Sequence, residues 1–286
     1  MTEEPSRNPS ALSGEEREKR MWERIQGGEA VESIDEMSDE YYVKLCSLML
    51  RQADSELAAA SCRLPWISRA PTMEERLAVA DIVRDELRHA RAMYRLSADV
   101  GIDTGAHIAL LDSMSVGRSW DGVLKRSEGG EEIWGGIFSC PMETWADFVM
   151  FQFCFDRGER HQLDDIRRST YGPWRREIDR IIKEELAHEN HGDFWVRKMA
   201  FERPARTEIQ EALNRWYPRT MNMFGKPEPE ENITLRKLGL KYRNEDEVRI
   251  SFTRELRVKC SECGLKLPAW EPDWEKVEED GVISDR

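Results

Sequence analysis

Hydrophobic positions recur at helical spacing along much of this chain, with polar residues between them. The pattern predicts helices over residues 38–61, 72–100, 142–165, 173–200 and 207–224. Thr72 and Glu75 form a capping-box pattern at the start of the second helix, and Gly101 follows its end. Pro173 suits the first turn of the fourth helix. No set of strand patterns large enough for a sheet is present in the sequence, so we expect an all-α fold.

The segments outside the main helices divide the chain into three parts. Residues 1–37 are polar and rich in Glu, Ser and Pro, and we expect a tail with one short charged helix before order begins at its end. Residues 38–224 hold the main helices, with the glycine-rich residues 101–140 as a long irregular connection. Residues 225–286 are expected to form an extension that packs on the bundle or on a partner. Within it, residues 247–258 fit a strand or a helix equally well.

Two of the predicted helices carry the same motif, Glu-x-x-His. Glu86 and His89 lie on the second helix, and Glu185 and His188 lie on the fourth. Residues three apart share one helix face, so each pair can direct a carboxylate and an imidazole at one point. Steps of three, four and seven residues back from each Glu meet only Val or Ile, which places both pairs on a core-directed face. An unpaired charge there is costly, so something inside the protein must compensate it.

An acidic residue on the preceding helix completes each half of the pattern. Glu56 lies 30 residues before Glu86, and Asp156 lies 29 residues before Glu185, so a helix pair repeats at an offset of about 100 residues. This repeat matches the ferritin-like four-helix bundle, in which two carboxylates and two Glu-x-x-His pairs converge on two metal ions. Residues 101–140 supply the single long crossover of such a bundle, and the fifth predicted helix is an additional C-terminal one.

Four carboxylates and two imidazoles form a hard, anionic ligand set that suits two iron or manganese ions better than a structural zinc ion. The predicted ligands are Glu56, Glu86, His89, Asp156, Glu185 and His188. Asp85 and Glu184 each precede a ligand Glu, and we expect them to orient an imidazole across the bundle, with Arg88 paired to one of them. The alternative, surface salt bridges on amphipathic helices, is disfavoured by the apolar faces that carry these residues.

The composition excludes several classes of partner. The chain has 56 Asp and Glu against 43 Lys and Arg, a net charge of -13, which argues against general binding to nucleic acid or to anionic membranes. No apolar run approaches the roughly 20 residues of a membrane span, and no secretory segment is recognised, so a cytoplasmic location is expected. The six cysteines do not resemble a disulfide framework. Cys260 and Cys263 form a lone CxxC, which we attribute to local structure rather than to half a zinc site or a redox pair.

Segments spread over about residues 38–270 resemble the catalytic subunits of the bacterial phenylacetyl-CoA epoxidases. They read DSELAAA, PWISRAPT, DELRHARAMYRLSADVG, TWADFVMF, RRSTYGPW, KEELAH and LNRWYPRTMNMFG. Matched position by position, the six predicted ligands fall on the di-iron ligands of that family, including Asp156 in place of the usual glutamate. The pairs Leu87-Arg88 and Leu186-Ala187 depart from the small Ala-Gly pair of the family's first motif. DELRH is also similar to the hydroxylase subunits of soluble multicomponent monooxygenases, so the exact substrate stays open.

The resemblance implies the catalytic subunit of a multicomponent di-iron monooxygenase that uses O2 to convert an aryl acyl-CoA, above all phenylacetyl-CoA, to its ring-1,2-epoxide in aerobic phenylacetate degradation. It also implies two iron ions, electrons from NADPH through a separate flavin and iron–sulfur reductase, small accessory subunits and a non-catalytic ferritin-like paralogous subunit. The alternatives are a related di-iron hydroxylase, monooxygenase or desaturase with another substrate, a non-catalytic scaffold subunit, and a ferritin-like iron-binding protein without oxygenase activity.

Other polar and aromatic side chains have simpler interpretations. His107, His161 and His191 lack a Glu three positions earlier and are interpreted as surface or packing residues. Phe148 and Phe155 on the third helix fit a pocket for an aromatic ring, but a place in the bundle core is the favoured interpretation. The residues that bind substrate are not identified by the sequence.

Overall fold

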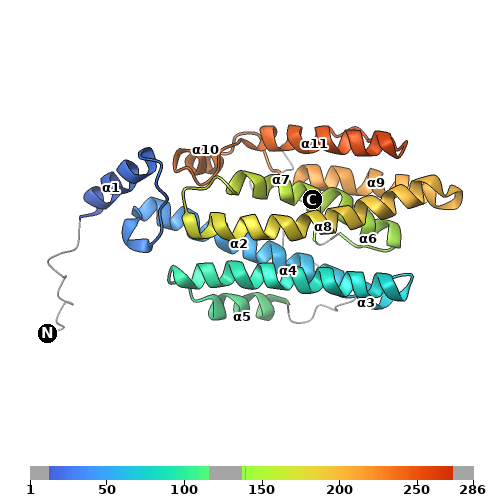
Figure 1. Ribbon diagram of the computed structural model, residues 1–286, viewed down its shortest axis with the longest axis horizontal. Helices are drawn as coiled ribbons and strands as arrows, with labels where there is room; N and C mark the ends of the chain where they lie inside the picture. Colours follow the sequence, from blue (N-terminus) through green and yellow to red (C-terminus); the bar gives the residue numbers. More distant parts are fainter. Residues whose placement is uncertain (1–12, 116–136, 139, 273–286) are drawn as a thin grey trace.

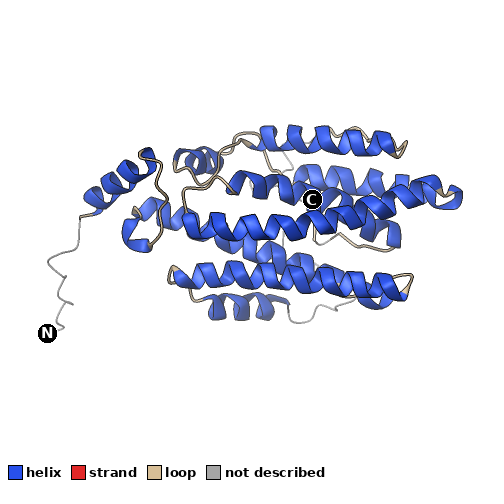
Figure 2. Ribbon diagram, viewed as in Figure 1, coloured by secondary structure: helices blue, strands red, loops and turns tan. Residues whose placement is uncertain are grey.

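The computed structural model describes residues 13–115, 137–138 and 140–272. These residues form helices joined by connections without strands (Figure 2), and the described part of the chain contains only an isolated parallel bridge between Val31 and Tyr171. The predicted all-α fold is confirmed. None of the described helices is long and apolar enough to cross a membrane.

Four helical rods form the centre of the molecule. They are α2 (Asp39–Arg63), α4 (Met73–Asp99), a third rod made of α6 (Trp145–Phe151), η2 (Gln152–Asp156) and α7 (Arg157–Ile166), and α8 (Gly172–Phe201). α2 packs on α4, the third rod packs on α8, and α4 meets α8 between the two pairs. Figure 1 shows the rods running along the long axis of the molecule. Two helix pairs joined in this way are what the predicted ferritin-like bundle requires.

Two clusters of buried apolar side chains flank the middle of the bundle. On α2 one cluster ends at Ala53 and the other begins at Ala58, and on α8 the corresponding boundary lies between Ile182 and Trp195. The buried residues between the clusters on α2, α4 and α8 are polar, apart from Gly192. The core therefore encloses a polar layer between apolar side chains on both sides.

The start of α4 differs in one detail from the predicted capping box. The Thr72 hydroxyl accepts a hydrogen bond from the Glu75 backbone N–H at 3.2 Å, as expected. The Glu75 carboxylate, however, lies against His191 of α8, with 2.7 Å between Oε2 and Nε2. A tertiary partner on a neighbouring helix thus replaces the local one that the sequence pattern indicated.

The third rod contains a π-helical segment, η2, between two α-helices. Its packing against α8 depends on Gly192, because a Cβ at that position would lie 2.9 Å from the Phe153 backbone nitrogen and 3.0 Å from the Gln152 Cβ. Glycine thus allows the two backbones to approach closely. A π-helical segment inside an α-helix is frequently found at a functional site, and η2 ends on Asp156.

The expectation that order begins near residue 38 is wrong. Ser13 caps α1 (Gly14–Gln26), and η1 (Ile34–Glu36) precedes α2. Met21 and Val31 are buried, and the Val31 N–H donates to the Thr170 carbonyl at 2.8 Å. Single apolar anchors this far apart leave no periodic pattern, which is why the segment was interpreted as a tail. The domain boundaries at residues 37 and 224 stay predictions.

Helices also replace two segments for which the sequence predicted no helix. The connection 101–140 was expected to be irregular, but it contains α5 (Thr104–Ser115); residues 116–136 and 139 lie outside the described part. The ambiguous residues 247–258 are helical and belong to α11. The remaining helices are α3 (Trp66–Arg69), α9 (Arg203–Asn222), α10 (Glu230–Lys237) and α11 (Glu245–Glu262).

Candidate metal centre

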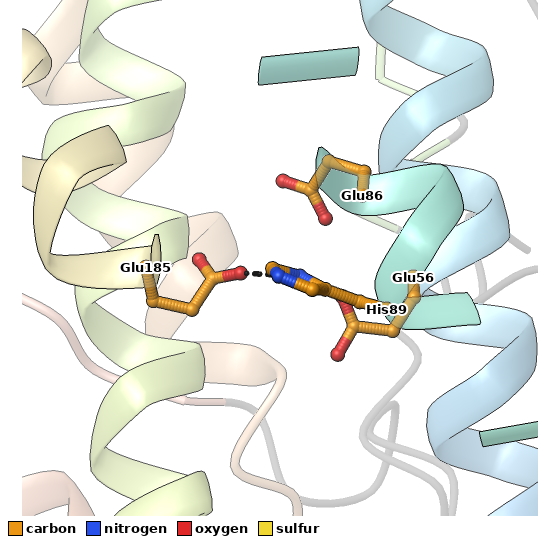
Figure 3. Close-up of side chains that lie close together, drawn as sticks. All are labelled: Glu56, Glu86, His89 and Glu185. Carbon is orange, nitrogen blue, oxygen red and sulfur yellow. Dashed lines mark ion pairs between the residues drawn. The ribbon is translucent and has the colours of Figure 1, made fainter. Parts of the chain in front are cut away.

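The six predicted ligands meet in the polar layer at the middle of the bundle. All are buried, with at most 2% of each residue exposed. Figure 3 shows Glu185 of α8 facing Glu56 of α2 and the Glu86–His89 pair of α4. His89 Nδ1 lies 3.1 Å from Glu185 Oε1 and 3.4 Å from Glu56 Oε2. Four rods that are far apart in the sequence thus each contribute a carboxylate to one site.

The side chains form two overlapping groups that could each hold a metal ion. One group is Glu56, Glu86, His89 and Glu185, and the other is Asp156, Glu185 and His188; within each group one ligand atom per residue lies within 4.8 Å of the others. Glu185 belongs to both, since its Oε2 is also 3.4 Å from His188 Nδ1. Two neighbouring positions that share one carboxylate are the layout of a two-metal centre.

The hydrogen bonding of these residues tests whether they fit metal ions. Among the described residues, the following buried atoms have no hydrogen-bond partner: Glu56 Oε2, both Glu86 oxygens, His89 Nδ1, Asp156 Oδ2, both Glu185 oxygens and both His188 nitrogens. Burying so many polar atoms without partners is costly, and native proteins avoid it. Metal coordination removes that cost, and hard oxygen and imidazole donors suit iron or manganese. The residues therefore fit a pair of such ions.

Crowding and burial shift the protonation of the cluster in opposite directions for acids and bases. Burial raises the pKa of Glu56 to about 7 and that of Asp156 well above its ordinary value. Burial alone would lower the pKa of His89, but hydrogen bonds with Glu185 and Glu56 raise it to about 12. Protons therefore balance part of the buried charge without metal, and metal binding releases protons from ligands that coordinate in deprotonated form.

The predicted outer residues lie across the bundle from the imidazoles. Glu184 Oε2 is 2.7 Å from His89 Nε2, while Asp85 Oδ2 is 3.8 Å from His188 Nε2. Arg88 contacts both acids, at 2.8 Å to Asp85 and 2.7 Å to Glu184, although the sequence indicated a contact with one of them. A His89 tautomer with its proton on Nε2 donates to Glu184 and directs the Nδ1 lone pair into the cluster. Their effect on bound metal stays a prediction.

Sequence reasoning missed a buried cation beside the ligands. Arg63, at the end of α2, is fully buried; its Nη1 lies 2.9 Å from Glu86 Oε1 and its Nη2 contacts Asp156 Oδ1. Two helical turns separate Arg63 from Glu56, so the two residues share a face of α2. That spacing could have indicated its place, but an arginine at a helix end is usually solvated, and nothing in the sequence shows it turning inward.

Two further buried residues beside the cluster were also missed. The Trp174 indole N–H donates to Gln52 Oε1 at 2.8 Å, and Gln52 Nε2 donates to Glu56 Oε1 at 3.3 Å, so a hydrogen-bonded chain orients Glu56. Glu159, three residues after Asp156 on the third rod, is also buried. Burial, together with repulsion from Glu56 and the other carboxylates, raises its pKa well above the usual value. Its spacing from Asp156 was the signal available in the sequence.

The other histidines have protein partners outside the cluster. His107 pairs with Asp54 at 2.9 Å, His161 with Glu255 at 2.9 Å, and His191 with Glu75 at 2.7 Å. These contacts agree with packing roles.

The remaining aromatic and thiol side chains lie in the core. Phe148 stacks on Trp145 with centroids 4.9 Å apart, and Phe155 stacks on Phe151 at 4.5 Å. Burial raises the pKa of Cys260 to about 12, which agrees with a structural thiol rather than a reactive one. No group that could hold a metal among the described residues includes Cys260 or Cys263.

The helical fold and the buried carboxylate–imidazole cluster define this chain as a helical-bundle protein with a candidate di-metal site. Residues 13–285 match the model of the family described as phenylacetic acid catabolic protein, and the chain belongs to that family. It is 26% identical over 260 residues to a protein of Escherichia coli (strain K12) that is named as a subunit of 1,2-phenylacetyl-CoA epoxidase. The alignment covers 90% of this chain and 78% of that protein. The resemblance found in the sequence is confirmed.

Proposed function

We propose that this protein is the catalytic, metal-binding subunit of a multicomponent oxygenase that epoxidises the aromatic ring of an aryl acyl-CoA, with phenylacetyl-CoA as the substrate. The observation that carries the proposal is the buried cluster of four carboxylates and two imidazoles with unpaired ligand atoms, in a chain of the phenylacetic acid catabolic family. The relative from Escherichia coli is named as an epoxidase of phenylacetyl-CoA and as one subunit of it.

The proposed cofactor is a pair of iron ions held by Glu56, Glu86, His89, Asp156, Glu185 and His188. Iron is proposed over manganese because, when bound, it supplies the activation of O2 that epoxidation needs. Placing one oxygen atom of O2 on the ring releases the other as water, and this consumes two electrons and two protons. We propose NADPH as the electron source, through a separate flavin and iron–sulfur reductase, and a cytoplasmic location, where NADPH and acyl-CoA thioesters are made.

The residues of the chain itself hold and shield such a centre. Glu184 orients His89, Gln52 orients Glu56, and Arg88 links the two outer acids. Apolar clusters on both sides of the polar layer keep bulk water away from it. Exclusion of water strengthens the electrostatic interactions inside the site and protects a reactive oxidant from side reactions.

The proposal is tested by turnover in a reconstituted complex. The full chain, combined with a paralogous helical subunit, accessory subunits and the reductase, is expected to consume phenylacetyl-CoA, O2 and NADPH, and mass spectrometry should show a product one oxygen atom heavier. His188→Ala should abolish turnover, because it removes an imidazole from the centre, whereas Asn190→Ala, an exposed change on the same helix, should retain it. Full turnover by His188→Ala, or no oxygenated product from the assembled complex, would contradict the proposal.

A further inference from the structure

The buried guanidinium of Arg63 divides the ligands into two unequal sets. It contacts Glu86 of the four-residue group and Asp156 of the three-residue group. The first group keeps three residues that Arg63 does not touch, Glu56, His89 and Glu185. The second keeps only Glu185 and His188.

We propose that Arg63 makes the two metal positions unequal, so that the protein binds metal in two steps, first at the four-residue group and then at the group that contains Asp156. The inference rests on the two-metal centre of the proposed function. In metal-free protein the guanidinium bridges Glu86 and Asp156 and holds α4 and η2 together through α2. The second ion must share or displace this bridge.

The charge of Arg63 fixes the direction of the effect. An arginine keeps its proton in a protein, and this one lies in a site from which water is excluded, so its repulsion of a second divalent ion is weakly screened. Removing the guanidinium also leaves two carboxylates uncompensated, which destabilises the metal-free protein more than the metal-bound one. Both effects predict that loss of Arg63 strengthens binding of the second ion and weakens the fold without metal.

Arg160 offers a matched control. It lies on α7, is mostly buried, and pairs with Glu189 and Glu255, neither of which belongs to the ligand groups. Replacing it removes a buried positive charge from the same bundle without touching a ligand. Arg63→Lys is a second comparison, because it keeps the charge but replaces the planar fork with a single ammonium group that bridges two carboxylates poorly.

The experiment is a calorimetric titration of full-length, chelator-treated protein with Mn²⁺, a hard divalent ion that air does not oxidise. The wild-type chain should show a tight step and a weaker one. In Arg63→Met the second step should tighten by about tenfold or more, Arg63→Lys should fall between, and Arg160→Gln should match the wild type. Circular dichroism should show less stable metal-free protein for Arg63→Met.

The possible results separate this inference from the metal centre itself. Equal steps in the wild type, or a second step in Arg63→Met that is unchanged or weaker, would overturn the role of Arg63 while leaving the centre intact. Mn²⁺ binding to no variant would overturn both. If Arg63→Met does not fold, native mass spectrometry of the wild type decides: at one equivalent of Mn²⁺ a dominant one-metal species is expected, and a random mixture of none, one and two ions would refute the proposal.

Discussion

The two imidazoles of the cluster have outer partners at different distances. Glu184 lies within hydrogen-bonding distance of His89, at 2.7 Å, whereas Asp85 is 3.8 Å from His188. A carboxylate on the far nitrogen of a ligating histidine fixes its tautomer and raises its basicity. At the scale of single residues, the Glu184 contact should therefore contribute more to metal binding than the Asp85 contact.

This difference predicts the effect of removing each acid. Glu184→Ala should weaken Mn²⁺ binding about 10- to 100-fold, the usual cost of losing an outer partner of a metal ligand. Asp85→Ala should weaken it less, because the longer contact orients His188 less firmly. Calorimetric affinities measure both, with Asp179→Ala as the control, since it removes an exposed acid of α8 that pairs with Arg167. A larger loss for Asp85→Ala than for Glu184→Ala would show that the distances do not rank the two contacts.

At the scale of elements, the position of Asp156 depends on how η2 packs against α8. The π-helical segment ends on Asp156, and Gly192 leaves room for the backbone of residues 152 and 153. Helical periodicity in the sequence predicted the rods to within a few residues, because burial on one face leaves a repeating pattern. It did not predict η2, since that segment arises from the approach of a second helix and not from the local sequence.

Gly192→Ala should displace η2, because a methyl group there would lie 2.9 Å from a backbone nitrogen that cannot rotate away. Overpacking of this kind costs about 1–3 kcal/mol in the free energy of unfolding, measured by urea denaturation, and the accompanying shift of Asp156 should weaken metal binding. Gly14→Ala is the control, because no heavy atom lies within 4 Å of the added methyl group. An unchanged denaturation midpoint for Gly192→Ala would contradict this account of the rod.

At the scale of the whole molecule, the sequence was sufficient for the fold class, the four rods and the six ligand candidates, because helical spacing and the duplicated motif are encoded in residue order. It was insufficient for features that depend on tertiary contacts. Val31 and Met21 are isolated anchors without a periodic pattern, and Arg63 at the end of a helix has no local signal that it is buried. The acidic net charge of -13 excluded partners but did not locate the site.

The central claim is that four rods hold two metal ions through six side chains, and metal analysis tests it most directly. Full-length protein purified from iron-replete cells is expected to contain about two iron ions per chain, the content of a di-iron bundle. Glu185→Ala, which removes the carboxylate common to both groups, should lose most of that iron while the circular dichroism stays helical. Correctly folded wild-type protein that remains essentially free of iron after anaerobic addition of Fe²⁺ would contradict the account.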